Sequence, residues 1–201
     1  MNTYIQIGAG AGDRDPNANF IDGFTRMIKS LDPATVGRVI LVEPNPVNIP
    51  FLKECWKDYP QAEIYEIGIC PSSYTDRTIT FYYYLEDGPH YQCTSINKEH
   101  TGHSELGEFQ ATCETLIDFL NRTVGNSHIN VLALDIEGID GDVILDTDWS
   151  AIDIDQLSFE YTNLKSQTDS VKNHLEMHGF EFIGTGLDRD GLDWMYQKRK
   201  N

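Results

Sequence analysis

The sequence is poor in basic residues. Its 201 residues include 15 Lys and Arg against 32 Asp and Glu, which gives a formal net charge of −17. So acidic a surface repels phosphate backbones, and the sequence shows no basic groove interleaved with stacking aromatic residues. We therefore expect that neither DNA nor RNA is a substrate and that the acidic surface serves solubility.

The sequence also lacks long hydrophobic runs and paired cysteines. No stretch is apolar enough to cross a membrane or to act as a secretory signal. The four cysteines are widely spaced and form no Cys-x-x-Cys pair, so zinc-site and redox spacings are both missing. We expect free thiols, a cytoplasmic location and no membrane partner.

The apolar pattern predicts one α/β domain over residues 1–201, large enough to bury a core without disulfide or metal staples. Strand-like and helix-like segments alternate, which is typical of a doubly wound sheet with right-handed crossovers. Helices are expected at about 15–31, after Pro46, at 112–121, at 139–145 and at 164–178. Strands are expected at 4–7, 39–42, 62–69, 78–85, 129–134 and 154–160, with a final antiparallel hairpin at 179–183 and 192–196.

The first strand runs directly into a glycine-rich turn, Gly8-Ala9-Gly10-Ala11-Gly12-Asp13. Glycine is favoured there because the backbone must bend sharply and approach a ligand closely. The dinucleotide fingerprint needs a third glycine where Asp13 stands, and an acid about 20 residues on, whereas Glu43 lies much further along. No Gly-Lys-Ser/Thr ending follows, so a P-loop is excluded.

Four motifs occur in a fixed order: GAGAGD at 8–13, VEPNP at 42–46, LDIEG at 134–138 and SFEY at 158–161. In this order they resemble the FkbM family of methyltransferases, over roughly residues 4–164. The resemblance implies the class I S-adenosylmethionine-dependent methyltransferase fold: a doubly wound, mostly parallel seven-stranded sheet with helices on both faces and a C-terminal antiparallel hairpin.

The resemblance also implies which residues bind the cofactor. The glycine turn would accommodate the methionine part, Glu43 the ribose hydroxyls, and the strand end near residue 68 the adenine. The alternatives are a turn without a ligand and a surface acid at position 43. The expected cofactor-binding residues are Gly8, Ala9, Gly10, Gly12, Glu43, Pro44, Ile67, Gly68 and Asp135.

Candidate catalytic groups are Asp135, Glu137 and His100. A carboxylate at the end of the central strand can align a substrate hydroxyl or act as general base, and Asp135 could also cap the next helix. The family's usual lysine two residues earlier is Ala133 here. Residues 71–112 interrupt the alternation of strands and helices and are interpreted as a substrate lid.

The presumed lid carries His90, His100 and His103, and a histidine near the acceptor could accept a proton at neutral pH. Three histidines in a polar loop could equally be solvent-exposed. The segment Cys93-Thr94-Ser95 is a further candidate for substrate contact, on position alone.

The expected reaction is O-methylation of a hydroxyl on a sugar or other polar small metabolite, with oxygen as acceptor implied by the resemblance alone. No metal site is assigned, although Asp135, Glu160 and Asn163 could together hold Mg²⁺; ordinary hydrogen bonding would explain the same residues. Two alternatives stay open: an NAD-type oxidoreductase and a non-catalytic cofactor-binding module. The oligomeric state is not predicted.

Overall fold

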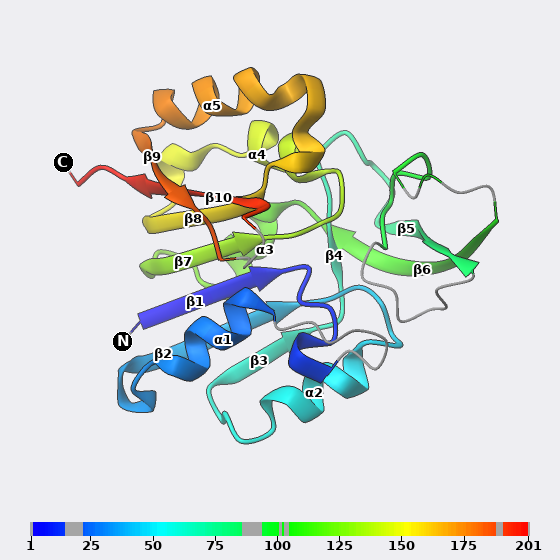
Figure 1. The fold of residues 1–201 in the computed structure, drawn as a ribbon, viewed down its shortest axis with the longest axis horizontal. Coiled ribbons are helices and arrows are strands. Elements are labelled where there is room, and N and C mark those ends of the chain that lie inside the picture. The colour runs from blue at the N-terminus through cyan, green and yellow to red at the C-terminus, as the bar shows by residue number, and fades with distance from the viewer. Residues whose placement is uncertain are drawn as a thin grey trace.

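A computed structural model describes residues 2–14, 22–85, 94–100, 102, 105–187 and 191–200 (Figure 1). Its main sheet has seven strands in the order β3-β2-β1-β7-β8-β10-β9. The strands are β1 Asn2–Ile7, β2 Val36–Val42, β3 Ala62–Tyr65, β7 Ile129–Leu134, β8 Ile154–Glu160, β9 Phe180–Thr185 and β10 Asp193–Lys198. The first five run parallel, and β10 is antiparallel to both β8 and β9. The expected class I methyltransferase sheet is confirmed.

Helices cover both faces of this sheet, as expected. Helices α1 Gly23–Ser30 and α2 Ile49–Trp56 contribute Phe24, Ile28, Leu52 and Trp56 to one buried cluster. The other face is covered by α3 Leu116–Thr123, α4 Asp140–Asp146 and α5 Thr168–Met177. Short 3-10 turns complete the chain at Gly12–Arg14, Pro33–Thr35, Trp149–Ala151 and Thr162–Gln167.

Two helix predictions need correction. The helix expected at 164–178 is an α-helix only over α5, because Thr162–Gln167 forms a 3-10 turn, and Val171 and Leu175 form the buried face of α5. The predicted helix at 112–121 begins only at Leu116, because Thr115 caps it by accepting a hydrogen bond from the Asp118 amide. Of the helix expected at about 15–31, residues 15–21 lie outside the described residues.

A second, three-stranded sheet was not predicted. The expected strand 62–69 is split: Ala62–Tyr65 joins the main sheet, whereas β4 Gly68–Ile69 pairs with β6 Leu106–Glu114, which in turn pairs with β5 Thr78–Tyr84. The missing side chain of Gly68 permits this packing, because a Cβ there would lie 2.7 Å from both Cys113 Sγ and Phe81 Cζ. Figure 1 shows β5 and β6 beyond the carboxyl ends of the parallel strands.

Three central strands end at the same level. Ile7 is paired in register with Val42 on one side and with Leu134 on the other. The loops that follow β1, β2 and β7 therefore meet at one edge, where ligands bind in open α/β sheets. None of the helices in the described ranges is long and apolar enough to cross a membrane.

Candidate active site

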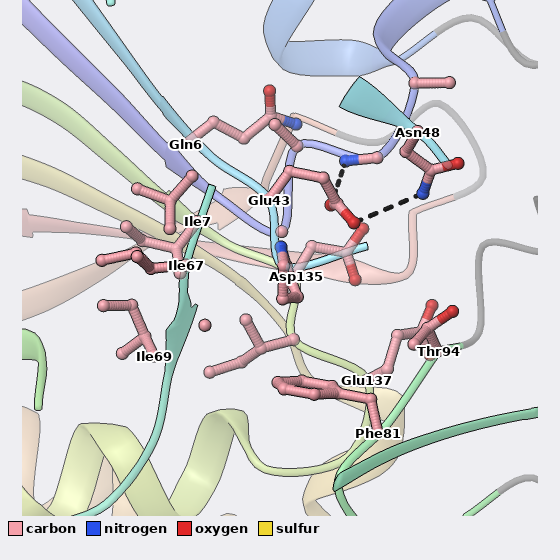
Figure 2. Close-up of a pocket in the computed structure, with 18 of the residues that line it drawn as sticks. Gln6, Ile7, Glu43, Asn48, Ile67, Ile69, Phe81, Thr94, Asp135 and Glu137 are labelled. Carbon is pink, nitrogen blue, oxygen red and sulfur yellow. Dashed lines mark hydrogen bonds between the residues drawn. The ribbon is translucent and has the colours of Figure 1, made fainter. Parts of the chain in front are cut away.

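A cavity that is open to solvent lies at this edge. Figure 2 shows Glu43 and Asp135 within it, with Ile67 and Ile69 on one side and Thr94 and Glu137 on the other. All the residues predicted to bind the cofactor line this cavity: Gly8, Ala9, Gly10, Gly12, Glu43, Pro44, Ile67, Gly68 and Asp135.

The three glycines of the turn have positive φ, and each has a different neighbour. A Cβ on Gly8 would lie 1.7 Å from the Asp135 carbonyl oxygen, and one on Gly12 would lie 2.9 Å from Cys55 Sγ. A Cβ on Gly10 would meet no atom of the described residues within 4 Å. Packing within the fold thus explains Gly8 and Gly12, whereas Gly10 faces open space where a ligand fits.

Glu43 is buried, with 4% of its surface exposed, so it is not a surface acid. Its Oε2 accepts a hydrogen bond from the Gly10 amide at 2.7 Å, and its Oε1 accepts one from Asn48 Nδ2 at 3.3 Å (Figure 2). Oε1 also accepts a hydrogen bond from the Asn45 amide at 2.8 Å. Burial raises the pKa of Glu43 to about 7, although these hydrogen bonds oppose the shift. The carboxyl group is therefore fixed against the glycine turn and close to changing charge at neutral pH.

Three polar residues that line the cavity were missed by sequence reasoning: Gln6, Asp22 and Asn48. Gln6 Nε2 donates to Asp22 Oδ1 at 2.8 Å, and Asp22 also caps α1 by accepting from the Thr25 amide. Burial raises the pKa of Asp22. The signal available in the sequence was a polar Gln6 between Ile5 and Ile7.

Two buried acceptor atoms beside the cavity, Gln6 Oε1 and Asn48 Oδ1, have no hydrogen-bond partner among the described residues. Burying an unpaired polar atom is unfavourable, so a ligand that brings hydrogen-bond donors fits here. S-adenosylmethionine offers such donors in its ammonium group and its ribose hydroxyls. The residues present therefore fit this cofactor.

Asp135 follows β7 directly, and its amide donates to the Ile7 carbonyl at 2.9 Å. Its side chain is exposed to the cavity but enclosed by protein on the other sides, and this burial raises its pKa well above the usual range. The neighbouring Glu137 carboxylate raises the pKa further. The alternative in which Asp135 caps the next helix is wrong: α4 starts at Asp140 with no side-chain cap.

Glu137 and His100 form a pair. Glu137 Oε2 lies 3.0 Å from His100 Nε2, and the His100 side chain is only 10% exposed, so it is not a solvent-exposed loop histidine. Ser95 Oγ donates to the Glu137 carbonyl at 2.6 Å. A Cβ on Gly138 would lie 2.5 Å from His100 Nδ1, so the ring packs against the backbone of the 135–138 loop. Residues His90, Cys93 and His103 lie outside the described residues.

Glu160 and Asn163 do not line the cavity, and the structure does not support the magnesium interpretation. Thr162 Oγ1 and Asn163 Nδ2 donate to the two oxygens of Glu160, so ordinary hydrogen bonds account for these side chains. Within the described ranges, no group of three or more His, Cys, Asp or Glu side chains is arranged to hold a metal ion.

Comparison with known proteins gives a family and a fold. The sequence model of the methyltransferase FkbM domain matches residues 6–182. Methyltransferase FkbM from Methylobacillus flagellatus KT has a similar structure, with a TM-score of 0.50 and 11% identity over 98% of this chain and 43% of that one. The chain thus spans less than half of that protein. No curated protein matches.

A fibrillarin pre-rRNA processing protein from Methanococcus jannaschii also has a similar structure, with a TM-score of 0.50 and 9% identity over 98% of this chain and 66% of that one. At such identities the likeness concerns the fold alone. Because a protein named for pre-rRNA processing shares the fold, the fold does not support the expected exclusion of nucleic acid, which stays a prediction from charge.

Proposed function

The chain belongs to the FkbM methyltransferase family, and on this premise we propose that it transfers the methyl group of S-adenosylmethionine to a hydroxyl of a sugar or another polar small metabolite. One observation carries the proposal. The glycine turn, the buried Glu43 and Asp135 line a single cavity, and the Gly10 amide donates to Glu43 across it.

We assign the cofactor to the residues that line the cavity. The turn at 8–12 would hold the methionine part, with Gln6 Oε1 as an acceptor for donors of the ligand. Glu43 and Asn48 would hold the ribose hydroxyls, since a carboxylate accepts two hydrogen bonds side by side. Ile67 and Gly68 would line the adenine site.

When bound, the cofactor supplies an electrophilic methyl group on its sulfonium. Asp135 accepts the proton of the acceptor hydroxyl, and its raised pKa makes it a stronger base than an ordinary carboxylate. The Glu137–His100 pair holds the neighbouring loop in place and is the second candidate for accepting that proton. The remaining contribution of the protein is positioning.

The acceptor would enter between the main sheet and the second sheet. Phe81 on β5 and Thr94 line the cavity on the side opposite the glycine turn. We propose that residues 71–112 form the wall over the acceptor and act as the lid. The net charge of −17 disfavours nucleic acid as acceptor.

The test is calorimetric titration with S-adenosylhomocysteine and, separately, with NADH. We expect micromolar binding of the first ligand and none of the second. The Glu43→Ala variant should bind S-adenosylhomocysteine about tenfold more weakly or worse, a loss of about 1.4 kcal/mol or more. Glu66→Ala, which removes an exposed carboxylate paired with Lys53, is the matched control and should bind normally.

Binding of NADH without S-adenosylhomocysteine would favour the oxidoreductase alternative and contradict the proposal. Binding of S-adenosylhomocysteine without methyl transfer to any sugar or polar alcohol would favour the non-catalytic module. Binding of neither ligand would contradict every cofactor assignment made above.

A further inference from the structure

Beside the glycine turn, Gln6 and Asp22 form a polar wall of the cavity. Gln6 lies on β1 and Asp22 immediately before α1, and both line the cavity together with the turn at 8–12. No Lys, Arg or His is found among the described residues that line the cavity. A cationic group of a ligand therefore meets acceptors at this wall, whereas an anionic group meets no cation of the described lining residues.

One hydrogen bond fixes the orientation of the Gln6 amide. Gln6 Nε2 donates to Asp22 Oδ1 at 2.8 Å, and a reversed amide would place two acceptor oxygens against each other. The nitrogen end is thus held by Asp22, and the other end, Oε1, has no hydrogen-bond partner among the described residues. Because Gln6 is 4% exposed, this acceptor is also shielded from bulk water. The amide leaves an unused acceptor in a residue that lines the cavity.

The partners of Asp22 among the described residues are uncharged. Its Oδ1 accepts from Gln6, and its Oδ2 accepts from the Thr25 amide at 2.6 Å, the contact that caps α1. Lys29 on the same helix pairs with Asp13 instead, at 3.3 Å. Burial raises the pKa of Asp22, and the negative charge of Asp13 raises it further. A cation that also donates hydrogen bonds would therefore stabilise the Asp22 carboxylate.

The methionine part of S-adenosylmethionine ends in two groups that need opposite surroundings. Its ammonium carries a positive charge and three donors, which match the unused Gln6 Oε1 and the carboxylate of Asp22. Its carboxylate carries a negative charge and acceptors alone, so Asp22 repels it and Gln6 Oε1 offers it nothing. At this wall the ammonium is therefore the group that fits.

We propose that Gln6 and Asp22 together bind the ammonium group of the cofactor, and that this amine, rather than the neighbouring carboxylate, decides which adenosyl ligands the cavity accepts. The ligand class is the thioadenosines that carry an aminopropyl chain, with or without the carboxylate. Gln6 and Asp22 are then specificity-determining residues in addition to the glycine turn and Glu43. This inference rests on the proposed methyltransferase function and narrows the recognition of its methyl donor.

The experiment compares two analogues of S-adenosylhomocysteine that each lack one charged group. The decarboxylated analogue ends in an aminopropyl chain, and the deaminated analogue ends in a carboxypropyl chain. The full chain is titrated calorimetrically with S-adenosylhomocysteine and with each analogue. We expect the aminopropyl analogue to bind at least about tenfold more tightly than the carboxypropyl analogue, because hydrogen bonds between charged partners are the strong ones.

Two variants locate the effect. Asp22→Asn removes the charge and keeps an oxygen that can cap α1, so it should fold and weaken the two amine ligands about tenfold without weakening the carboxypropyl analogue. Gln6→Leu removes the acceptor and should weaken the amine ligands several-fold. Asp32→Asn is the matched control: Asp32 caps the 3-10 turn Pro33–Thr35 at an exposed position, and its loss of charge should leave all three affinities unchanged.

Equal binding of the two analogues, tighter binding of the carboxypropyl analogue, or a preference that survives both variants would overturn the inference. Thermal unfolding checks that the variants fold, and if one does not, the wild-type comparison of the analogues decides. If S-adenosylhomocysteine does not bind to the wild type, the methyltransferase proposal fails. If it binds and the amine preference is missing, the ammonium inference alone fails.

Discussion

At the scale of single residues, Gly8 and Gly10 stand two positions apart in one turn but are required for different reasons. Gly8 lies against the backbone of the 135–138 loop, because a Cβ there would overlap the Asp135 carbonyl oxygen. Gly10 has room for a Cβ within the protein and is constrained by its φ of +52° and by the ligand space it faces. A substitution at Gly8 should therefore lower mainly the stability of the fold, and a substitution at Gly10 should lower mainly the affinity for the ligand.

We predict that Gly10→Ala folds and loses about 1–2 kcal/mol of stability, the usual cost of a left-handed conformation for a residue with a Cβ. Its affinity for S-adenosylhomocysteine should fall at least tenfold, because the methyl group enters the cavity. Gly8→Ala should be far less stable. Urea unfolding and calorimetry on the two variants test this, and normal ligand affinity in Gly10→Ala would contradict the placement of the cofactor.

Sequence patterns located some of these residues and missed others for a physical reason. Glu43 and Asp135 follow buried strands, so the fold alone brings them to one edge. Gln6, Asp22 and Asn48 reach the cavity through side-chain hydrogen bonds and helix caps, whose partners depend on tertiary packing. The contact of His100 with Glu137, between residues far apart in sequence, likewise depends on how the 94–100 segment folds back.

At the scale of elements, the strands of the main sheet and the helices that cover it were predictable because apolar residues recur at a regular spacing in each of them. The second sheet was not, because the continuous pattern of 62–69 conceals a change of partner between Tyr65 and Gly68. Only tertiary structure shows that Gly68 packs against Phe81 and Cys113. Gly68 thus marks the point at which the chain leaves the main sheet and joins the second sheet.

We predict that Gly68→Ala destabilises the protein by about 1–3 kcal/mol, the usual range for overpacking a core. The added methyl group must displace the Phe81 ring, which lines the cavity, so S-adenosylhomocysteine should also bind more weakly. Thermal unfolding and calorimetry measure the two effects. Gly125→Ala, at a positive φ of 60° beyond the end of α3, controls for backbone strain and should leave ligand affinity unchanged.

A second prediction at this scale concerns the 94–100 segment. Ser95 is 1% exposed, its hydroxyl donates to the Glu137 carbonyl, and its backbone exchanges two hydrogen bonds with Tyr82. Ser95→Ala removes this hydrogen bond and the one that Ser95 Oγ accepts from the Asn97 amide, so it should cost about 1–3 kcal/mol. Amide hydrogen exchange in residues 94–100 should accelerate, while exchange in β1 and β7 should not change. Unaltered exchange in 94–100 would show that these hydrogen bonds do not hold the segment on the 135–138 loop.

At the scale of the whole molecule, the charge of −17 combines with several buried carboxyl groups. Burial raises the pKa of Glu43 to about 7 and that of Asp140 to about 7, and it raises those of Asp22, Asp135 and Glu160 as well. A carboxyl whose pKa is raised on folding contributes stability below its ordinary pKa and loses it as the pH rises through the folded-state pKa. The ionisation of each of these carboxyl groups therefore lowers the stability of the folded protein as the pH rises.

We predict that the ligand-free protein is markedly less stable at pH 8 than at pH 5. The ionised form of each carboxyl with a pKa near 7 is disfavoured by a few kcal/mol, at about 1.4 kcal/mol per pH unit. Thermal unfolding at pH 5, 6, 7 and 8 should show a falling midpoint, and Asp140→Asn should flatten the decline. Asp118→Asn, an exposed change on α3, should leave the slope as it is. A midpoint that rises over this range would contradict the burial argument.

The separation of the two sheets has a consequence for how such a protein diversifies. The residues proposed to hold the methyl donor and to accept the proton follow β1, β2 and β7, which are paired in register. Part of the opposite wall belongs to the small sheet, which is joined to the main sheet by the short connection before β4 and by α3 after β6. On the proposed function, insertions or exchanges in that small sheet would alter which molecule is methylated and would leave the donor side untouched.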